Sequence, residues 1–388
     1  MTADARARVE IDLGALAGNL RLIRRAVGGT GVFGVVKADA YGHGAVAVSF
    51  ELERLGIDGL AVSRVSEVGE LRRSGVRSPL LLLGGPASIE ELARAVEWNA
   101  TPVLTRREQI ADWSAWRRRS SGSATPLGVV VELDTGMSRY GVPLDEWPLV
   151  LQEVRSAPEL RLAGLMSHLA ESELPKSGFT ALQEQRFAAA VEALGPEERE
   201  NVSLHLSNSA GALRRVSARW DAVRVGGALY GLDLASAADP SPASGLRPVM
   251  RVVAPILDLR QVPAGTGVGY RRTWKAPRDA TIGLVPVGYG DGFSTALGAG
   301  DVLVSGVRCP LAGQVSMDSL TVDVTGVPGV MVGDECVLLG SQGDERIEVA
   351  ELAARAGVAA YEVWCGFERR LPRKVLDPGR PREGGRGR

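Results

Sequence analysis

The chain has 388 residues and a formal charge of −1 at pH 7. Its length favours two domains, and the near-zero charge gives no electrostatic reason to expect nucleic acid or a membrane surface as a partner. The 3 cysteines, Cys309, Cys336 and Cys365, are too widely spaced for a zinc site, so we predict buried thiols and no metal. The first residues show no apolar signal segment and no later run approaches the length of a membrane span, so we expect a cytoplasmic protein.

Candidate strands alternate with helical patterns from the start of the chain to about Gly231. The apolar runs that predict strands are Val32–Val36, Gly59–Ser63, Pro79–Leu83, Thr101–Leu104, Gly128–Leu133, Leu162–Ser167, Val202–Leu206 and Ala222–Val225. Helix start signals occur between them, such as Asp12 before Leu13 and the capping-box pattern from Ser88 to Glu91. This alternation predicts a (β/α)8 barrel, an α/β fold, over residues 8–234.

The composition of the sequence changes after the predicted barrel. Residues 235–247 are rich in Ala, Ser and Pro and indicate a linker, and residues 377–388 indicate a disordered tail. Between them, residues 248–376 predict a mainly β domain with one short helix at about 350–356. The strands expected there are Met250–Leu259, Thr281–Val287, Asp301–Val304, Ser319–Val324 and Glu335–Leu339.

Lys37 closes the apolar run Gly31–Val36 and is followed by Ala-Asp-Ala-Tyr-Gly-His-Gly. A lysine at the end of a buried strand is partly desolvated, which lowers its pKa, so its neutral amine could form a Schiff base. The simpler alternative is that the Lys37 side chain extends to solvent along the apolar surface.

Other polar residues follow the predicted barrel strands at their carboxyl ends, where the active sites of such barrels lie. They are Asp134 to Arg139 after the fifth strand, His168 after the sixth, Asn208 and Ser209 after the seventh, and Gly226 and Gly227 after the eighth. Each has a structural alternative, such as an exposed Arg139, a core His168 or a tight turn at the glycines. A glycine pair entering a short helix could also bind a phosphate. Arg224 lies inside an apolar run, so it should have a buried acceptor.

The run from Val35 to Gly44 resembles the attachment site of pyridoxal phosphate (PLP) in alanine racemases, and the resemblance extends from about Val9 to Arg373. It implies that Lys37 binds the cofactor and that Tyr41 donates to its phosphate. By the same resemblance, the remaining cofactor contacts would be Ser209, Gly226, Gly227 and Tyr361 around the phosphate, Arg224 at the pyridine nitrogen, and His168 with Asn208 in the network that supports a catalytic tyrosine.

The stretch Val268-Gly-Tyr270-Arg-Arg-Thr-Trp274 resembles the family motif whose tyrosine reaches the active site of the partner subunit. A tyrosine in such a stretch could instead be structural. Racemisation, however, removes a proton from one face of Cα and returns it to the other, so two groups must flank the substrate. The resemblance implies that these are Lys37 and Tyr270 and that the enzyme is a homodimer. Since a phenol ordinarily has a pKa of about 10, we expect Arg224 and His168 to supply positive charge near it.

Two further stretches match the family, Gly288 to Gly292 with Tyr289, and Val315 to Asp318 with Met317. They would narrow the entrance, and the Met317 N–H would help Arg139 to bind the substrate carboxylate. A narrow pocket favours the methyl group of alanine, although one methylene or hydroxyl is worth only about 1–3 kcal/mol of discrimination. The implied function is interconversion of L- and D-alanine, the latter a peptidoglycan precursor.

Three other functions stay open. A broad-specificity or serine racemase is compatible with the same motifs. A non-catalytic PLP-binding protein would lack the β domain that contains Tyr270, and a fold-related decarboxylase would be expected to show a Cys-Asp motif rather than Val-Ser-Met-Asp.

The chain departs from the family at two positions. Many members carry, two residues before Asp-Thr-Gly, a lysine modified to a carbamate that braces the substrate-binding arginine; here Glu132 stands at that position. It keeps a negative charge near Arg139 without needing carbon dioxide. Arg271 replaces the glycine that commonly follows the tyrosine, which places a cation beside Tyr270.

Overall fold

The computed structural model describes residues 7–120, 125–174, 177–232, 245–298, 300–367 and 370–376. The predicted tail, residues 377–388, lies outside these ranges, and so does the predicted linker up to residue 244. The chain forms two compact units. The barrel unit comprises Ala17–Ala40 and Ala45–Leu246, and the second unit comprises Met1–Leu16, Tyr41–Gly44 and Arg247–Arg388.

The barrel unit is a closed parallel sheet. Its strands are β2 (Gly31–Val35), β3 (Gly59–Val62), β4 (Leu80–Leu82), β5 (Ala100–Leu104), β6 (Leu127–Asp134), β8 (Leu160–Met166), β9 (Ser203–His205) and β10 (Ala222–Val225). Neighbouring strands pair in parallel, and the β5–β6 pairing closes the ring. The eight predicted strands and the barrel are therefore confirmed, with ends that shift by a residue or two.

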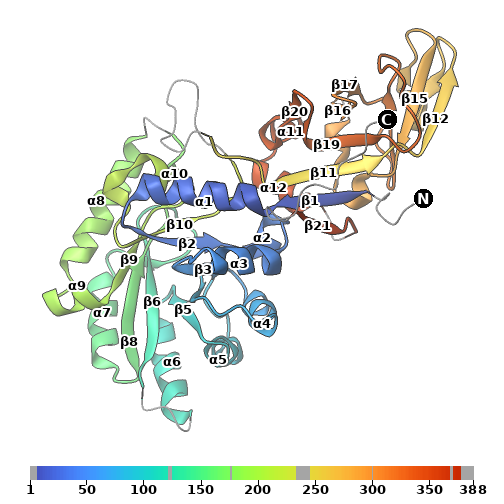
Figure 1. Cartoon of the computed structure of the whole chain (residues 1–388). Coiled ribbons are helices and arrows are strands. Elements are labelled where there is room, and N and C mark those ends of the chain that lie inside the picture. Colours follow the sequence, from blue (N-terminus) through green and yellow to red (C-terminus); the bar gives the residue numbers. More distant parts are fainter. Residues whose placement is uncertain are drawn as a thin grey trace. The chain divides into compact units, whose positions relative to one another are not determined.

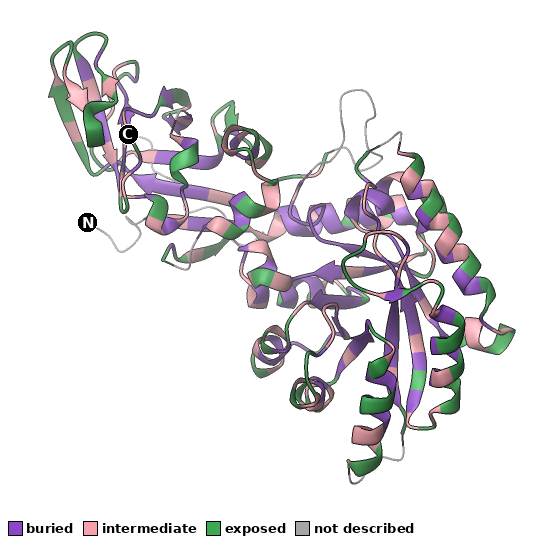
Figure 2. Ribbon diagram, turned by 180° about the vertical axis from the view of Figure 1, so that it is seen from behind, coloured by how far each residue is buried: buried purple, intermediate pink, exposed green. Residues whose placement is uncertain are grey.

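Helices surround this sheet (Figure 1). They are α1 (Leu13–Val27), α3 (Ala45–Arg54), α4 (Val65–Arg73), α5 (Ile89–Glu97), α6 (Glu108–Arg119), α7 (Trp147–Ser156), α8 (Gly178–Glu192), α9 (Pro196–Asn201) and α10 (Ser209–Arg214). The short segment α2 (Lys37–Tyr41) is a left-handed turn rather than an ordinary helix. The barrel unit also contains the short strand β7 (Val142–Pro143) and the 3-10 turn η1 (Val216–Ala218). The strands are buried on both faces, whereas the helices show exposed residues on their outer sides (Figure 2). Every residue of β3, β4 and β10 is buried, which explains why these strands are apolar in the sequence except for Arg224 in β10.

The first strand of the chain belongs to the second unit. Residues 8–16 were predicted as part of the barrel domain, but β1 (Arg8–Asp12) pairs antiparallel with β11 (Met250–Pro255) and parallel with β21 (Arg373–Leu376). The sequence of β1 alternates Val, Glu and Ile, which is typical of a sheet with one polar face rather than of a barrel strand. Asp12 caps α1 as predicted, since its Oδ1 accepts the Ala15 N–H at 2.8 Å.

The second unit is mainly β, as predicted. Its larger sheet has the order β17-β16-β19-β11-β1-β21, with β20 beside β19. The elements not yet given are β12 (Asp258–Val262), β13 (Gly267–Val268), β14 (Trp274–Lys275), β15 (Ala280–Val285), β16 (Asp301–Val304), β17 (Val307–Pro310), β18 (Leu320–Asp323), β19 (Glu335–Gln342), β20 (Glu345–Ile347), the 3-10 turns η2 (Tyr270–Arg272), η3 (Tyr289–Asp291) and η4 (Thr295–Leu297), and the helices α11 (Val349–Ala356) and α12 (Ala360–Gly366).

Two details of the prediction for this unit were wrong. A second helix, α12, follows the predicted one; its sequence Ala-Tyr-Glu-Val-Trp-Cys-Gly mixes aromatic and β-branched residues, which carry little helical signal. Cys365 in this helix is exposed, whereas Cys309 and Cys336 are buried thiols.

In the described ranges no helix is long and apolar enough to cross a bilayer.

Candidate active site

Lys37 stands half-buried at the end of β2, where the backbone makes an unusual turn. The four residues after it have left-handed backbone angles without any glycine, with φ of 51° at Ala38, 55° at Asp39, 54° at Ala40 and 53° at Tyr41. Each such residue costs roughly 1–2 kcal/mol relative to a right-handed one, so the turn must be held by its surroundings.

Two carboxylates hold this turn within the barrel unit. Glu67 Oε1, from α4, accepts the N–H of Ala38 at 2.7 Å, and Asp39 Oδ1 accepts the N–H of Ala45 at 2.7 Å. The backbone that follows Lys37 is therefore fixed by two hydrogen bonds. Glu67 was not predicted as a site residue; its only sequence signal is its place three residues after Arg64 at the start of α4.

Arg224 is buried on β10, with 3% of its surface exposed. Its Nη2 donates to the carbonyl oxygens of Ser167, at 2.5 Å, and Leu206, at 3.4 Å, so the predicted buried acceptor is present. Its Nη1 is buried and has no hydrogen-bond partner among the described residues. Burial lowers the pKa of Arg224 to about 10, and the Glu132 carboxylate opposes this effect, so the guanidinium stays charged at neutral pH. It can donate one more hydrogen bond to an acceptor such as a ring nitrogen.

Glu132 lies near the end of β6, and only 5% of its surface is exposed. Burial raises its pKa to about 7, against the opposing effects of Arg224, Arg139 and Lys37. Its Oε2 has no hydrogen-bond partner in the described part of the chain. The positive charge that acts on it most strongly is Arg224, whereas Arg139 is exposed and lies 5.9 Å from the centroid of the Tyr140 ring.

His168 follows β8 and is half-buried. Burial lowers the pKa of His168 to about 3, and the positive charges of Arg224 and Arg139 act in the same direction. The imidazole is therefore neutral at pH 7. The prediction that His168 contributes positive charge to the site was wrong; the positive charge comes from the arginines.

The glycine pair after β10 is organised by Ser209. The Ser209 Oγ accepts the N–H of Gly226 at 3.0 Å and of Ala228 at 3.3 Å. The pair enters a turn, closed by the Leu229 N–H on the Gly226 oxygen at 2.8 Å, so of the two conformations left open by the sequence the turn is present and the short helix is not. The Gly227 N–H is buried and has no acceptor among the residues that the structure describes, so it fits a phosphate oxygen.

Asn208 is the N-cap of α10. Its Oδ1 accepts the N–H of Gly211 at 3.0 Å and the hydroxyl of Ser172 at 2.7 Å, and its Nδ2 donates to the Leu169 oxygen at 3.3 Å. It thereby connects the start of α10 with the segment that follows His168.

The second unit contains a pair of tyrosines predicted to bind the phosphate. Tyr41 and Tyr361 pack edge to face, with ring centroids 5.4 Å apart. Burial raises the pKa of Tyr41 well above its usual range, so its phenol remains protonated and can donate. The structure thus brings together two residues that are distant in the sequence.

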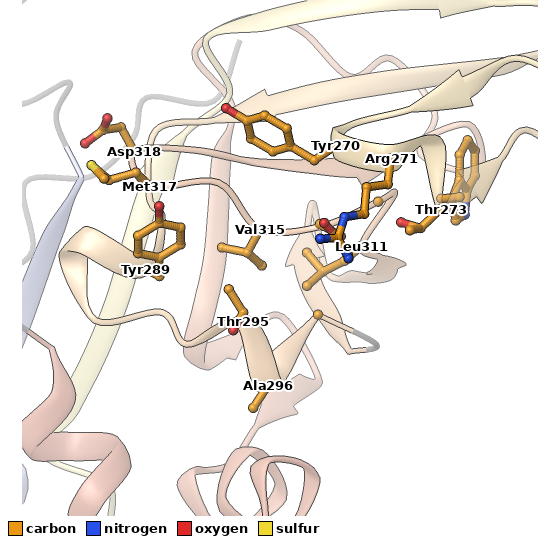
Figure 3. A pocket seen from close by; sticks show the side chains of 14 residues that line it. Tyr270, Arg271, Thr273, Tyr289, Thr295, Ala296, Leu311, Val315, Met317 and Asp318 are labelled. Atoms are coloured by element: carbon orange, nitrogen blue, oxygen red, sulfur yellow. The ribbon is translucent and has the colours of Figure 1, made fainter.

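Tyr270 lies on a depression of about 1180 Å³ in the second unit (Figure 3). Its side chain is 68% exposed, and Tyr289 and Met317 on the same depression are 45% and 53% exposed. Arg271, with φ 57°, and Asp318 also line it. The other lining residues are Thr273, Trp274, Thr295, Ala296, Gly298, Leu311, Gly313, Gln314 and Val315.

The two predicted entrance loops are joined by backbone hydrogen bonds. The Tyr289 N–H donates to the Ser316 oxygen at 3.0 Å, and the Gly290 N–H donates to the Met317 oxygen at 2.9 Å. The Met317 N–H itself has no acceptor in the described ranges, so it is available to a ligand carboxylate. Asp318 forms an ion pair with Arg370 at 2.7 Å.

The predicted site residues fall into two groups. The barrel unit holds Lys37, Glu132, Arg139, His168, Asn208, Ser209, Arg224, Gly226 and Gly227, and the second unit holds Tyr41, Tyr270, Tyr289, Met317, Asp318 and Tyr361. In the first group, the unpartnered Arg224 Nη1 and Gly227 N–H fit the ring nitrogen and the phosphate of PLP.

Comparisons with known proteins agree over nearly the whole length of the chain. The model of the alanine racemase N-terminal domain matches residues 11–234, and that of the C-terminal domain matches residues 249–375. An alanine racemase from Synechocystis sp. is 38% identical over 377 residues, which cover 96% of this chain and 99% of that protein. One from Sorangium cellulosum is 39% identical and covers the same shares.

Solved structures give the same result. Alanine racemase from E. faecalis has a TM-score of 0.88 and 30% identity, covering 97% of this chain and 100% of that one. The biosynthetic alanine racemase from Pseudomonas aeruginosa has a TM-score of 0.85 and 35% identity, covering 96% and 100%. A structure from Bartonella henselae, with covalently bound pyridoxal phosphate, has a TM-score of 0.85 and 27% identity, covering 96% and 100%. The chain therefore belongs to the alanine racemase family, whose members are PLP-dependent isomerases.

Proposed function

We propose that Lys37 and Tyr270 are the two acid–base groups with which this alanine racemase interconverts L-alanine and D-alanine. The cofactor PLP, when bound, accepts electron density from Cα and so makes its proton acidic. Each of the two residues would move a proton on one face of Cα, as inversion requires.

Lys37 would hold the cofactor through its amine. Its Nζ would also take the Cα proton on one face of the substrate or return it there. The half-buried position of Lys37 and the carboxylate of Glu67 on the next residue support this role, because both limit where the amine can lie.

Arg224 would donate from Nη1 to the ring nitrogen of the cofactor. Since an arginine keeps its proton, the ring nitrogen would stay unprotonated and withdraw fewer electrons from Cα. The phosphate would be bound by the Gly227 N–H with Ser209 and Gly226 beside it, and by the protonated phenols of Tyr41 and Tyr361. These donors support binding of a dianion, which needs several hydrogen bonds at once.

Tyr270 would act in the active site of a second copy of the chain. Its exposed side chain, together with the exposed Tyr289 and Met317, supports an isologous dimer in which each chain offers its second unit to the barrel of the other. A neutral His168 would then accept a hydrogen bond from the Tyr270 phenol, and Asn208 would hold the segment that follows His168. The nearby guanidinium of Arg224 would stabilise the phenolate.

The substrate carboxylate would be bound by the guanidinium of Arg139 and the N–H of Met317. Glu132 would supply the negative charge that balances the buried Arg224 and the exposed Arg139, as the carbamate does in other members of the family. Tyr289 and Asp318 would narrow the entrance of the site, so that a substrate with a methyl side chain fits best.

The observation that carries this proposal is the half-buried Lys37 in the same unit as two buried donors without partners, Arg224 Nη1 and the Gly227 N–H. A chiral assay with alanine, serine, lysine and arginine, together with an absorption spectrum of the purified protein, tests it. We expect a bound PLP chromophore and the highest kcat/KM for alanine. A colourless protein, or a preference for lysine or arginine, would contradict the proposal.

A further inference from the structure

Gln183, in α8, has no exposed surface and uses every hydrogen-bonding group of its side-chain amide. Its Nε2 donates to the His168 oxygen at 2.9 Å and to Thr135 Oγ1 at 3.1 Å, and its Oε1 accepts the Ala170 N–H at 2.9 Å. One side chain thus joins the segment after β8 to the segment after β6.

The hydrogen bonds continue from Thr135 in a single direction. Thr135 Oγ1 and Ser167 Oγ are 2.8 Å apart, and the Ser167 hydroxyl donates to the Leu133 oxygen at 2.7 Å. Because the Ser167 proton goes to Leu133, the hydroxyl of Thr135 must donate to Ser167. The chain therefore runs from Gln183 through Thr135 and Ser167 to Leu133, and each group has only one possible orientation. A buried network with one satisfied arrangement is rigid.

This network borders three residues of the proposed site. The backbone oxygen of Ser167 accepts a hydrogen bond from Arg224 at 2.5 Å, and the backbone oxygen of His168 accepts one from Gln183. Thr135 is the first residue of the loop that leads to Arg139. The backbone oxygen of Thr135 is also held, because it accepts a hydrogen bond from Arg186 Nη1 at 2.8 Å.

We propose that Gln183 is a positioning residue that fixes the positions of Arg139 and His168 relative to Arg224. This inference rests on the proposed function, since it assigns a purpose to groups that would bind substrate and support Tyr270. Gln183 acts only through Thr135 and the backbone after β8. A side chain that merely satisfied buried polar groups would affect stability but not the substrate affinity of the folded enzyme.

The test compares the PLP-loaded parent with Gln183→Met, which keeps the shape of the side chain and removes its hydrogen bonds. We expect kcat/KM for alanine to fall roughly 10- to 100-fold, since displacement of a substrate-binding group by about 1 Å has an effect of this order. Propionate, a carboxylate of similar size without the amine, should inhibit several-fold more weakly, because its binding depends on Arg139. The PLP content and spectrum should not change.

A matched control exists in the same barrel. Gln109 is also a buried glutamine, and its Oε1 accepts the N–H groups of Thr105 and Arg106 at 2.9 and 3.0 Å. It follows β5, which carries none of the proposed site residues. Gln109→Met should change the thermal midpoint but leave the KM for alanine and the propionate inhibition constant unchanged.

A second pair of variants tests the next link of the network. Thr135→Val removes the hydroxyl and should reproduce the kinetic defect of Gln183→Met, whereas Thr135→Ser keeps the hydroxyl and should behave as the parent. The double variant Gln183→Met/Thr135→Val should be little worse than either single one, because both break the same chain. If Gln183→Met does not fold, the contrast between Val and Ser at position 135 decides the question.

The proposal is overturned if folded Gln183→Met has the KM and propionate affinity of the parent, if Gln109→Met shows the same kinetic loss, or if Thr135→Ser is as impaired as Thr135→Val. A parent enzyme that did not racemise alanine would contradict the proposed function instead. Propionate affinity would still report whether Gln183 positions Arg139.

Discussion

Glu67 accepts a hydrogen bond from the N–H of Ala38, at 2.7 Å, and Ala38 is the residue directly after Lys37. The other oxygen of Glu67 accepts the N–H groups of Ser63 and Arg64, at 2.8 and 2.9 Å. One carboxylate thus ties the loop after β3 to the strained turn after β2. The backbone of Lys37 is fixed by a residue 30 positions further along the chain, because only the folded barrel brings the two loops together.

This arrangement predicts that PLP is attached to Lys37. Reduction of the purified enzyme with borohydride should fix the cofactor to the peptide that contains Lys37, because no other lysine of the described ranges lies at the end of a barrel strand. Peptide mapping by mass spectrometry measures this directly. A label on any lysine other than Lys37, or no label at all, would contradict the assignment.

Glu132 predicts an enzyme that does not need carbon dioxide. A lysine carbamate forms reversibly from carbon dioxide, whereas Glu132 carries a permanent carboxyl group, so removing bicarbonate should leave the rate unchanged. Glu132→Gln should reduce kcat/KM about tenfold, because Arg224 and Arg139 would lose the nearby negative charge that acts on them.

The variant Glu132→Lys provides the converse test. It restores the residue that many family members carry, so its activity should rise with added bicarbonate, as measured in degassed and bicarbonate-supplemented buffers. A parent enzyme that responds to bicarbonate, or a fully active Glu132→Gln, would show that Glu132 does not replace the carbamate.

The raised pKa of Glu132 also predicts a pH dependence of stability. Its pKa is about 7 in the folded protein against an ordinary value of 4.5, so the folded state binds more protons than the unfolded state between these values. The free energy of unfolding should therefore decrease as the pH rises through this window, and the loss is complete above pH 7. It amounts to about 3 kcal/mol for a pKa that changes from 4.5 to about 7.

Glu132→Gln removes this titration. In the cofactor-free protein its thermal midpoint should exceed that of the parent by an amount that grows from pH 5 to pH 8. A difference between the two proteins that is constant with pH would mean that Glu132 titrates normally. A stabilised but less active variant would fit a site that keeps a buried charge for function.

The crowded surroundings of Gly288 predict that substitution at this position weakens substrate binding. A Cβ at this position would lie 2.2 Å from the Ser316 oxygen and 2.3 Å from the Met317 oxygen, so Gly288→Ala must displace the loop that carries the Met317 N–H. The KM for alanine should rise more than kcat falls. Gly283→Ala is the control, since the nearest atom to its Cβ is 3.5 Å away, and it should keep the parent KM. Equal KM values for the two variants would remove Met317 from substrate binding.

The barrel could be predicted from sequence because most residues of its strands are apolar, as buried parallel strands require. The assignment of β1 to the second unit could not, because its partners β11 and β21 lie more than 230 residues away. The same holds for Tyr41: the sequence places it beside Lys37, but in the structure it packs with Tyr361 in the second unit.

Electrostatic properties were the least predictable part of the site. The residue types at the strand ends indicated the chemistry, but the neutral state of His168 follows from its burial beside two arginines, which no local pattern shows. Gln183 was missed for a related reason. Gln183 and Phe187 lie four residues apart on the buried face of α8. A polar residue at such a position indicates a buried hydrogen-bond network only once its partners are known.

The most direct test of the account concerns the two catalytic residues in one dimer. Tyr270→Phe and Lys37→Ala should each lose racemisation, Tyr270→Phe by roughly 10²–10⁴-fold, since positioned acid–base catalysis contributes about this much.

The two variants can be coexpressed with different tags and the mixed dimer purified. If Tyr270 acts in the active site of the partner subunit, one of the two sites of this dimer contains both Lys37 and Tyr270, and the dimer should recover about half of the parent activity. A mixed dimer as inactive as the two single variants would contradict the central claim that each site is built from both chains.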